Sequence, residues 1–133
     1  MKLFFLLMLS FLAVFHSCES PKNDDVVGTW QSNDSAEFQF YEDGHFNVKY
    51  IPKSILFGNY KDKSLFSGTG VWNIQYMENT WKIELLFPRS NVLPGGFACY
   101  LDIEKKLNWR NTSWSLFFYG ENFDYKYIFI RSK

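Results

Sequence analysis

Few side chains in this chain of 133 residues could do chemistry. Of its two histidines, only His45 lies beyond the apolar N-terminal segment, and it stands beside a predicted turn, where a lone histidine is usually solvated. His45 and one spare cysteine, Cys99, lack the number and spacing of a zinc site. No Gly-x-Ser-x-Gly motif occurs, and Gly68-Thr69-Gly70 lacks the rest of a phosphate loop. We therefore expect no enzyme, no cofactor and no metal. The sequence alone does not exclude a pair of carboxylates brought together on neighbouring strands.

The N-terminus predicts where the protein is sent. Lys2 and the apolar run Leu3–Phe15 form a targeting signal that is too short to span a bilayer as a permanent helix. The following Phe15-His16-Ser17-Cys18 resembles the lipobox of bacterial lipoproteins, in the looser form found in Bacteroidota. The resemblance implies that residues 1–17 are removed and that Cys18 carries lipid. It also implies a place in the cell envelope, anchored to the outer membrane and facing either side. The alternative is ordinary secretion with cleavage after Ser20.

The two cysteines bear on the same question. If Cys18 is lipidated, Cys99 is alone, and in its predicted strand it behaves as a small core hydrophobe. The rival is a Cys18–Cys99 disulfide, as expected of an exported chain with an even cysteine count. Residues 18–25 are polar and without apolar period, which predicts a flexible tether ahead of one domain at 26–133.

The charge balance argues against nucleic acid as a partner. The chain has 14 basic and 14 acidic residues, so removing Lys2 with the signal leaves 13 against 14. No basic run is visible, and nucleic-acid binding needs a positive patch.

The elements that must position any site are strands, and the clearest pair is Gly70–Phe87. Aromatic residues make up 21% of the chain, and aromatics favour strands. Apolar residues alternate with polar ones on both sides of Glu78-Asn79, which predicts a hairpin folded about that pair. Its apolar face would then hold three cross-strand pairs: Tyr76 with Trp81, Ile74 with Ile83, and Trp72 with Leu85.

A second hairpin and several further strands follow from the same pattern. Tyr41 would meet His45 across a turn in which Gly44 takes the left-handed conformation, with Phe40 opposite Phe46. Altogether the pattern predicts eight strands: 29–32, 36–41, 45–51, 67–76, 80–87, 97–103, 114–119 and 125–131. Antiparallel neighbours joined by short turns are typical of an all-β, eight-stranded up-and-down barrel. Its interior is either filled by side chains or holds one small ligand.

A motif at the start of the domain and one residue at its end carry a family resemblance. Gly28-Thr29-Trp30 resembles the Gly-x-Trp signature of the lipocalins, and Arg131 matches the basic residue that packs on that tryptophan. The family's Thr-Asp-Tyr segment and C-terminal helix are not found here, and this argues against a spacious ligand pocket. Val26-Val27-Gly28-Thr29-Trp30 is more similar to the small lipocalin-like lipoproteins of Bacteroidota. The resemblance implies a barrel with a Trp30–Arg131 pair.

Two functions fit these features. The first is a membrane-anchored, non-catalytic binding module for a small apolar ligand. The second is an envelope interaction protein, such as an inhibitor or immunity protein, that acts through its outer surface. A cavity of a few hundred Å³ would favour the ligand, and a packed core would favour the partner. The residues expected to line the ligand site or fill the core are Trp30, Phe38, Phe40, Trp72, Ile74, Trp81 and Ile83.

The last hairpin is apolar on both faces, although a barrel strand normally exposes one face to water. Phe117 and Tyr119 would lie on the outer face. We expect a cover there, either Ile55-Leu56-Phe57 folded across as a lid or a partner molecule, because contiguous apolar patches tend to mark interaction sites.

Overall fold

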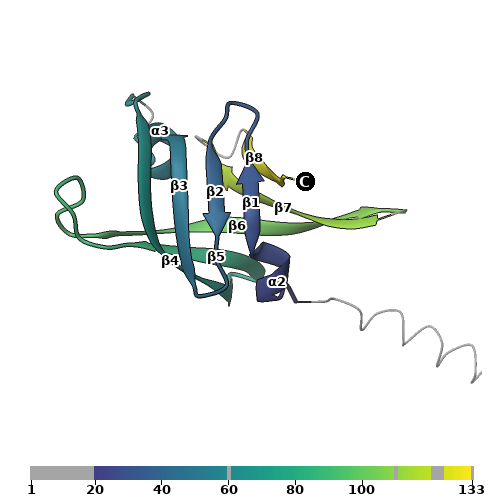
Figure 1. Cartoon of the computed structure of the whole chain (residues 1–133). Coiled ribbons are helices and arrows are strands. Elements are labelled where there is room, and N and C mark those ends of the chain that lie inside the picture. The colour runs from purple at the N-terminus through teal and green to yellow at the C-terminus, as the bar shows by residue number, and fades with distance from the viewer. Residues whose placement is uncertain (1–19, 60, 110, 121–124, 133) are drawn as a thin grey trace, which may run out of the picture.

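The computed structural model describes residues 20–59, 61–109, 111–120 and 125–132. The domain is all-β apart from two one-turn helices, as Figure 1 shows. In chain order the elements are α2 (Asn23–Val26), β1 (Gly28–Gln31), β2 (Glu37–Phe40), β3 (His45–Pro52), α3 (Lys53–Leu56), β4 (Leu65–Met77), β5 (Thr80–Phe87), β6 (Phe97–Asn108), β7 (Asn111–Tyr119) and β8 (Lys126–Arg131).

The eight strands close into an antiparallel barrel in which each strand pairs with its neighbours in the chain, and β8 pairs with β1. The predicted fold class is confirmed. Because successive strands alternate in direction, the connections alternate between two ends of the barrel. One end carries α2, at the bottom of Figure 1, and the other carries α3, at the top.

The central hairpin forms in the predicted register. Tyr76 pairs with Trp81, Ile74 with Ile83 and Trp72 with Leu85. Glu78 and Asn79 have φ angles of 53° and 62°. Two successive left-handed residues make a turn whose twist matches that of the flanking strands. The turn therefore fixes the same register that the apolar pattern requires.

The β2–β3 hairpin also forms as predicted. Phe40 pairs with Phe46, and the Tyr41 N–H donates to the His45 carbonyl at 2.9 Å. Gly44 has a φ of 87°, a conformation that costs glycine nothing because it has no Cβ.

Three details of the sequence-based prediction were wrong. The tether was predicted to reach residue 25, but Pro21 is buried and Asn23–Val26 is helical. The segment between the predicted strands 45–51 and 67–76 was expected to lack regular structure, but it contains the helix α3. The polar stretch after Ile103 continues as strand, with Glu104 opposite Ser115, because a hairpin ladder needs no buried face.

Aromatic rings fill the core of the barrel. The ring centroid of Phe38 lies 5.0 Å from that of Phe129, 5.4 Å from Phe40, 6.0 Å from Phe46 and 6.3 Å from Phe118. The rings of Phe38 and Phe40 are stacked and the other three pairs are tilted or edge-on, and such contacts add about 0.5–1.5 kcal/mol per pair beyond the burial of apolar area. Rings from β2, β3, β7 and β8 therefore meet near the barrel axis. None of the helices in the described part of the chain is long and apolar enough to cross a membrane.

Candidate functional site

The seven residues predicted to line a ligand site or fill the core all pack in or against the core cluster. Ile74 and Trp81 are half-buried, because their part of the β4–β5 hairpin lies near its tip. The others are buried: Trp30, Phe38, Phe40, Trp72 and Ile83. These side chains occupy the interior instead of lining an opening.

The predicted pair of Trp30 and Arg131 is in contact at the α2 end. The two residues are paired across β1 and β8, and the Arg131 guanidinium carbon lies 4.9 Å from the centroid of the indole. Arg131 also donates to the carbonyl oxygens of Asp24 and Asp25, while the Trp30 indole N–H donates to Val26 O at 2.7 Å. Helix α2 is thus held against this end of the barrel from two sides.

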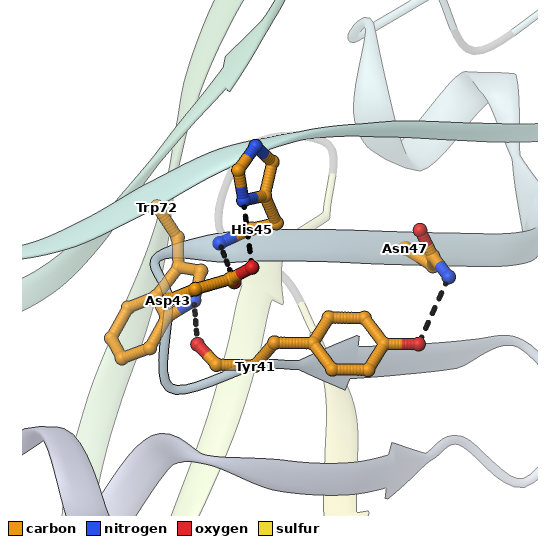
Figure 2. Close-up of polar contacts among 5 residues, drawn as sticks. All are labelled: Tyr41, Asp43, His45, Asn47 and Trp72. Carbon is orange, nitrogen blue, oxygen red and sulfur yellow. Dashed lines mark hydrogen bonds and ion pairs between the residues drawn. The ribbon is translucent and has the colours of Figure 1, made fainter.

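A second indole ties β4 to the β2–β3 turn, as Figure 2 shows. The Trp72 indole N–H donates to the Tyr41 carbonyl at 3.1 Å, and the Trp72 backbone N–H donates to Gly44 O at 2.8 Å. The Trp72 ring meets Phe40 edge-on at 5.5 Å. Trp72 therefore anchors this turn to the core and fixes the start of β3.

His45 begins β3 beside that turn and points outward (Figure 2). Its Nδ1 lies 3.2 Å from an oxygen of Asp43, and its backbone N–H donates to the other oxygen of Asp43 at 3.0 Å. That backbone hydrogen bond lowers the pKa of Asp43, because it favours the charged carboxylate. Both side chains are largely exposed, so the pair orients His45 without enclosing it.

His45 stands at one end of a groove of about 440 Å³ on the outer wall, where β3, β4 and β5 meet. Val71 and Leu86 lie opposite each other on its surface and are 42% and 37% exposed. Its lining is mainly apolar and consists of His45, Thr69, Gly70, Val71, Leu86, Phe87 and Pro88.

A second groove, of about 260 Å³, continues toward the α3 end. It shares Thr69, Phe87 and Pro88 with the first, so the two form one continuous depression, here called the outer trough. The second groove is lined by Phe66, Ser67, Gly68, Thr69, Phe87, Pro88, Ser90, Val92 and Leu93.

The trough exists because β5 stops before β4 does. The β4–β5 ladder ends at Val71 opposite Leu86, and the same register would place Pro88 opposite Thr69. Proline has no N–H and cannot donate to a ladder. At the divergence, a Cβ on Gly70 would lie 2.2 Å from the Leu86 carbonyl oxygen, so glycine allows the two strands to approach there.

The predicted lid, Ile55-Leu56-Phe57, does not cover the outer face of the last hairpin, because it packs on the inner side with Leu116 and Phe118. Leu56 is buried in the core cluster, and Ile55 and Phe57 pack against it. The Phe57 ring meets Phe66 and Phe97 edge-on at 5.3 Å and 4.8 Å. The segment is short and apolar, and α3 turns it inward to close the end of the barrel.

The outer face of the last hairpin is only partly covered by its own side chains, since Tyr119, Ile128 and Ile130 are 41%, 36% and 61% exposed. Phe117 is buried, although it lies outside the core cluster. Lys126 Nζ lies 4.3 Å from the centroid of its ring, and Tyr119 meets that ring edge-on at 5.2 Å. Lys126 also pairs with Glu104 at 3.2 Å. Lysine stems cover apolar surface while the ammonium group stays in water, so Lys126 interrupts the predicted apolar patch.

The remaining reactive groups form no second site within the described residues. Cys99 is a free thiol, and burial raises its pKa to about 12, which disfavours the nucleophilic thiolate. No cluster of potential metal ligands occurs in the part of the chain that the structure describes. The other candidate, Cys18, lies outside the described residues.

The sequence analysis missed the trough. The signal was present in Pro88, directly after an apolar strand, and in the glycines at 68 and 70. Together they predict that one strand ends opposite a stretch of its neighbour in which two residues have no side chain. Comparison of the chain with family models, curated proteins and solved structures finds no match. The trough must therefore be interpreted from its own geometry.

Proposed function

We propose that this protein is a non-catalytic binding module that is tethered to the cell envelope by lipid on Cys18. It recognises a protein partner through the outer trough. The observation that carries the proposal is the contrast between the two sides of the barrel wall. Aromatic rings from β2, β3, β7 and β8 fill the interior, whereas the trough on the β4–β5 side leaves apolar side chains in water. Exposed apolar surface beside a groove favours a binding surface.

The chemistry of the trough supports binding instead of catalysis. Its one titratable side chain among the described lining residues is His45, and the carboxylate beside it, Asp43, is exposed. General acid–base catalysis needs groups that converge on one substrate atom with pKa values tuned to the task. The lining offers instead an apolar floor with the hydroxyls of Ser67, Thr69 and Ser90 at its edges.

A small apolar ligand is the second candidate, and the volume of the groove beside His45 favours it. About 440 Å³ falls within the range of small-molecule sites. In that case the ligand would lie against Val71, Leu86 and Phe87 on the outer wall, and not inside the barrel as the lipocalin resemblance implies.

Photocrosslinking in the producing cells tests the proposal. A photoreactive residue at Val71 of the full chain should yield a protein adduct of one defined mass. The matched control is the same substitution at Ile130, which is apolar and 61% exposed on β8, four strands away around the barrel. Adducts of equal yield at both positions, or none at Val71, would refute a partner at the trough. For the small-ligand candidate, native mass spectrometry of the purified protein should show a bound molecule that is lost in Val71→Glu.

A further inference from the structure

One edge of β4 has no strand beside it over nearly half of the element. β4 pairs with β3 as far as Leu65, which lies opposite Pro52. It pairs with β5 only from Val71 onward. Among the described strands, none pairs with the β5-side edge of residues 65–70. That edge forms one wall of the outer trough.

The backbone groups on this edge can be assigned from the hydrogen bonds on the other. Trp72 N–H donates to Gly44 O on the β3 side, and Ser64 O accepts from Lys53 N on the same side. Backbone groups alternate between the two edges of a strand. The backbone N–H and C=O groups of the even-numbered residues of β4 therefore point toward β3. Those of Leu65, Ser67 and Thr69 point toward the trough. Such a row is a template for another strand.

The opposite wall of the trough limits what can reach that template. Ser90, Val92 and Leu93 of the β5–β6 loop line the depression across from β4. A segment that pairs with this edge is one strand wide, whereas a second barrel would bring its neighbouring strands against the loop. This favours a peptide segment over a second copy of the protein.

The floor of the trough selects the side chains of the segment. The rings of Phe66 and Phe87 meet edge-on at 5.6 Å beneath it. Gly68 has no side chain to cover them, and a Cβ there would lie 2.8 Å from Phe66 Cζ. A strand added to β4 would place every second side chain toward this floor. Those side chains should be apolar.

Two positive charges at the α3 end of the trough favour an acidic residue on the bound segment. Lys63 lies two residues before β4 and Arg89 follows Pro88, so both chains that border the trough carry an exposed cation there. A carboxylate on the segment would be attracted at that end, which favours one orientation of the peptide over the other.

We propose that the outer trough binds an extended segment of a partner protein by strand addition to the Leu65–Thr69 edge of β4. Alternate residues of the segment are apolar, and an acidic residue lies toward Lys63 and Arg89. The inference rests on the proposed function and specifies its ligand. Backbone hydrogen bonds would supply affinity, and the floor would supply selectivity.

The test uses linear peptides selected from a random displayed library against the purified full chain. A selected peptide is labelled, and its affinity is measured by fluorescence anisotropy. Methylating its backbone nitrogens one at a time should weaken binding tenfold or more at every second position and less than twofold between. This period of two is specific to strand addition. A flat profile, or a library that yields no binder, overturns the proposal.

Two variants examine the β4 side. Thr69→Pro removes the N–H that faces the trough and leaves the β3 ladder in place, so it should weaken binding tenfold or more. Thr69→Val keeps the N–H and should bind within twofold of the parent. Equal binding by Thr69→Pro overturns strand addition, and the methylation profile decides the matter if that variant does not fold.

Self-association that Thr69→Pro abolishes would assign the edge to a second copy instead. Crosslinking at Val71 that persists in Thr69→Pro would leave the proposed function standing without this ligand.

Discussion

Arg131 on the last strand lies across the indole of Trp30 on the first, with 4.9 Å between the guanidinium carbon and the ring centroid. The two residues also pair where β8 meets β1, so the contact lies at the closure of the barrel. The same guanidinium donates to the carbonyl oxygens at the end of α2. One side chain thus joins the two ends of the domain and the helix that precedes it.

Replacing Arg131 with alanine should therefore lower the free energy of unfolding by about 1–2 kcal/mol, from the lost cation–π contact and the lost hydrogen bonds. Arg131→Lys should recover less than half of this, because lysine has no planar fork to reach two carbonyls. Urea denaturation provides the measurement. The control is Lys49→Ala, which removes an exposed cation of β3 and should cost less than about 1 kcal/mol. Equal losses in Arg131→Ala and Lys49→Ala would show that the contact at the barrel closure adds no stability beyond that of an exposed cation.

The two tryptophans of the central hairpin should differ in their contribution to stability. Trp72 is buried and bonded to the β2–β3 turn, so Trp72→Ala should cost about 3–5 kcal/mol. Trp81 is half-buried near the tip of the hairpin, so Trp81→Ala should cost about 1–2 kcal/mol. Thermal unfolding followed by circular dichroism ranks the two. A larger loss for Trp81→Ala would mean that the tip of the hairpin, not its base, carries the stability.

The register of this hairpin could be predicted because two independent signals agreed. The alternation of Trp72, Ile74 and Tyr76 fixes which side chains share a face, and a shift by one residue would turn all of them outward. Glu78-Asn79 fixes where the chain reverses. Where only one signal was present, as in the polar strand after Ile103, the prediction stopped too early.

The two short helices and the trough could not be predicted in the same way. α2 and α3 each span one turn, which is too short to show a helical period, and tertiary contacts of Val26 and Leu56 hold them in place. For the trough, Pro88 and the glycines at 68 and 70 indicate where β5 ends, but the separation of β4 from the loop after Pro88 is a relationship between segments that local patterns do not encode. Ile55-Leu56-Phe57 was recognised as apolar, but the sequence did not say which surface it would meet.

The approach of β5 to β4 at Gly70 makes that position intolerant of a side chain. Gly70→Ala would place a Cβ 2.2 Å from the Leu86 carbonyl oxygen, so the strands must separate. We expect a loss of about 1–3 kcal/mol or more. Gly95→Ala is the control, because a Cβ there has no neighbour within 4 Å, and it should be neutral within about 0.5 kcal/mol. The midpoint of urea unfolding reports both, and a neutral Gly70→Ala would show that β5 is not held against β4 at this point.

Cys99 should react slowly with thiol reagents in the folded protein. Burial raises its pKa to about 12 from an ordinary value of 9.0, so the thiolate fraction at pH 8 falls about a thousandfold. Labelling by iodoacetamide should accelerate about tenfold per pH unit beyond pH 9, where an exposed thiol levels off. The folded state keeps a proton that the unfolded state loses, so stability declines as the pH rises from about 9 toward 12. Rapid labelling at pH 8 without urea would contradict this environment.

The proposed tether can be tested through the two cysteines, which the two readings of the N-terminus treat differently. If Cys18 carries lipid, Cys18→Ser should move the protein from the membrane fraction to the soluble fraction and abolish the processed, lipid-bearing mass. Cys99→Ser should change neither, because the thiol of Cys99 is free. Under the alternative of a Cys18–Cys99 disulfide, the parent protein would migrate differently on reducing and non-reducing gels. Both variants would abolish that difference in mobility, and neither would alter membrane association. Mass spectrometry of the mature chain separates the alternatives: an acylated Cys18 supports the tether, whereas an unmodified Cys18 bonded to Cys99, or a chain that begins after Ser20, excludes it.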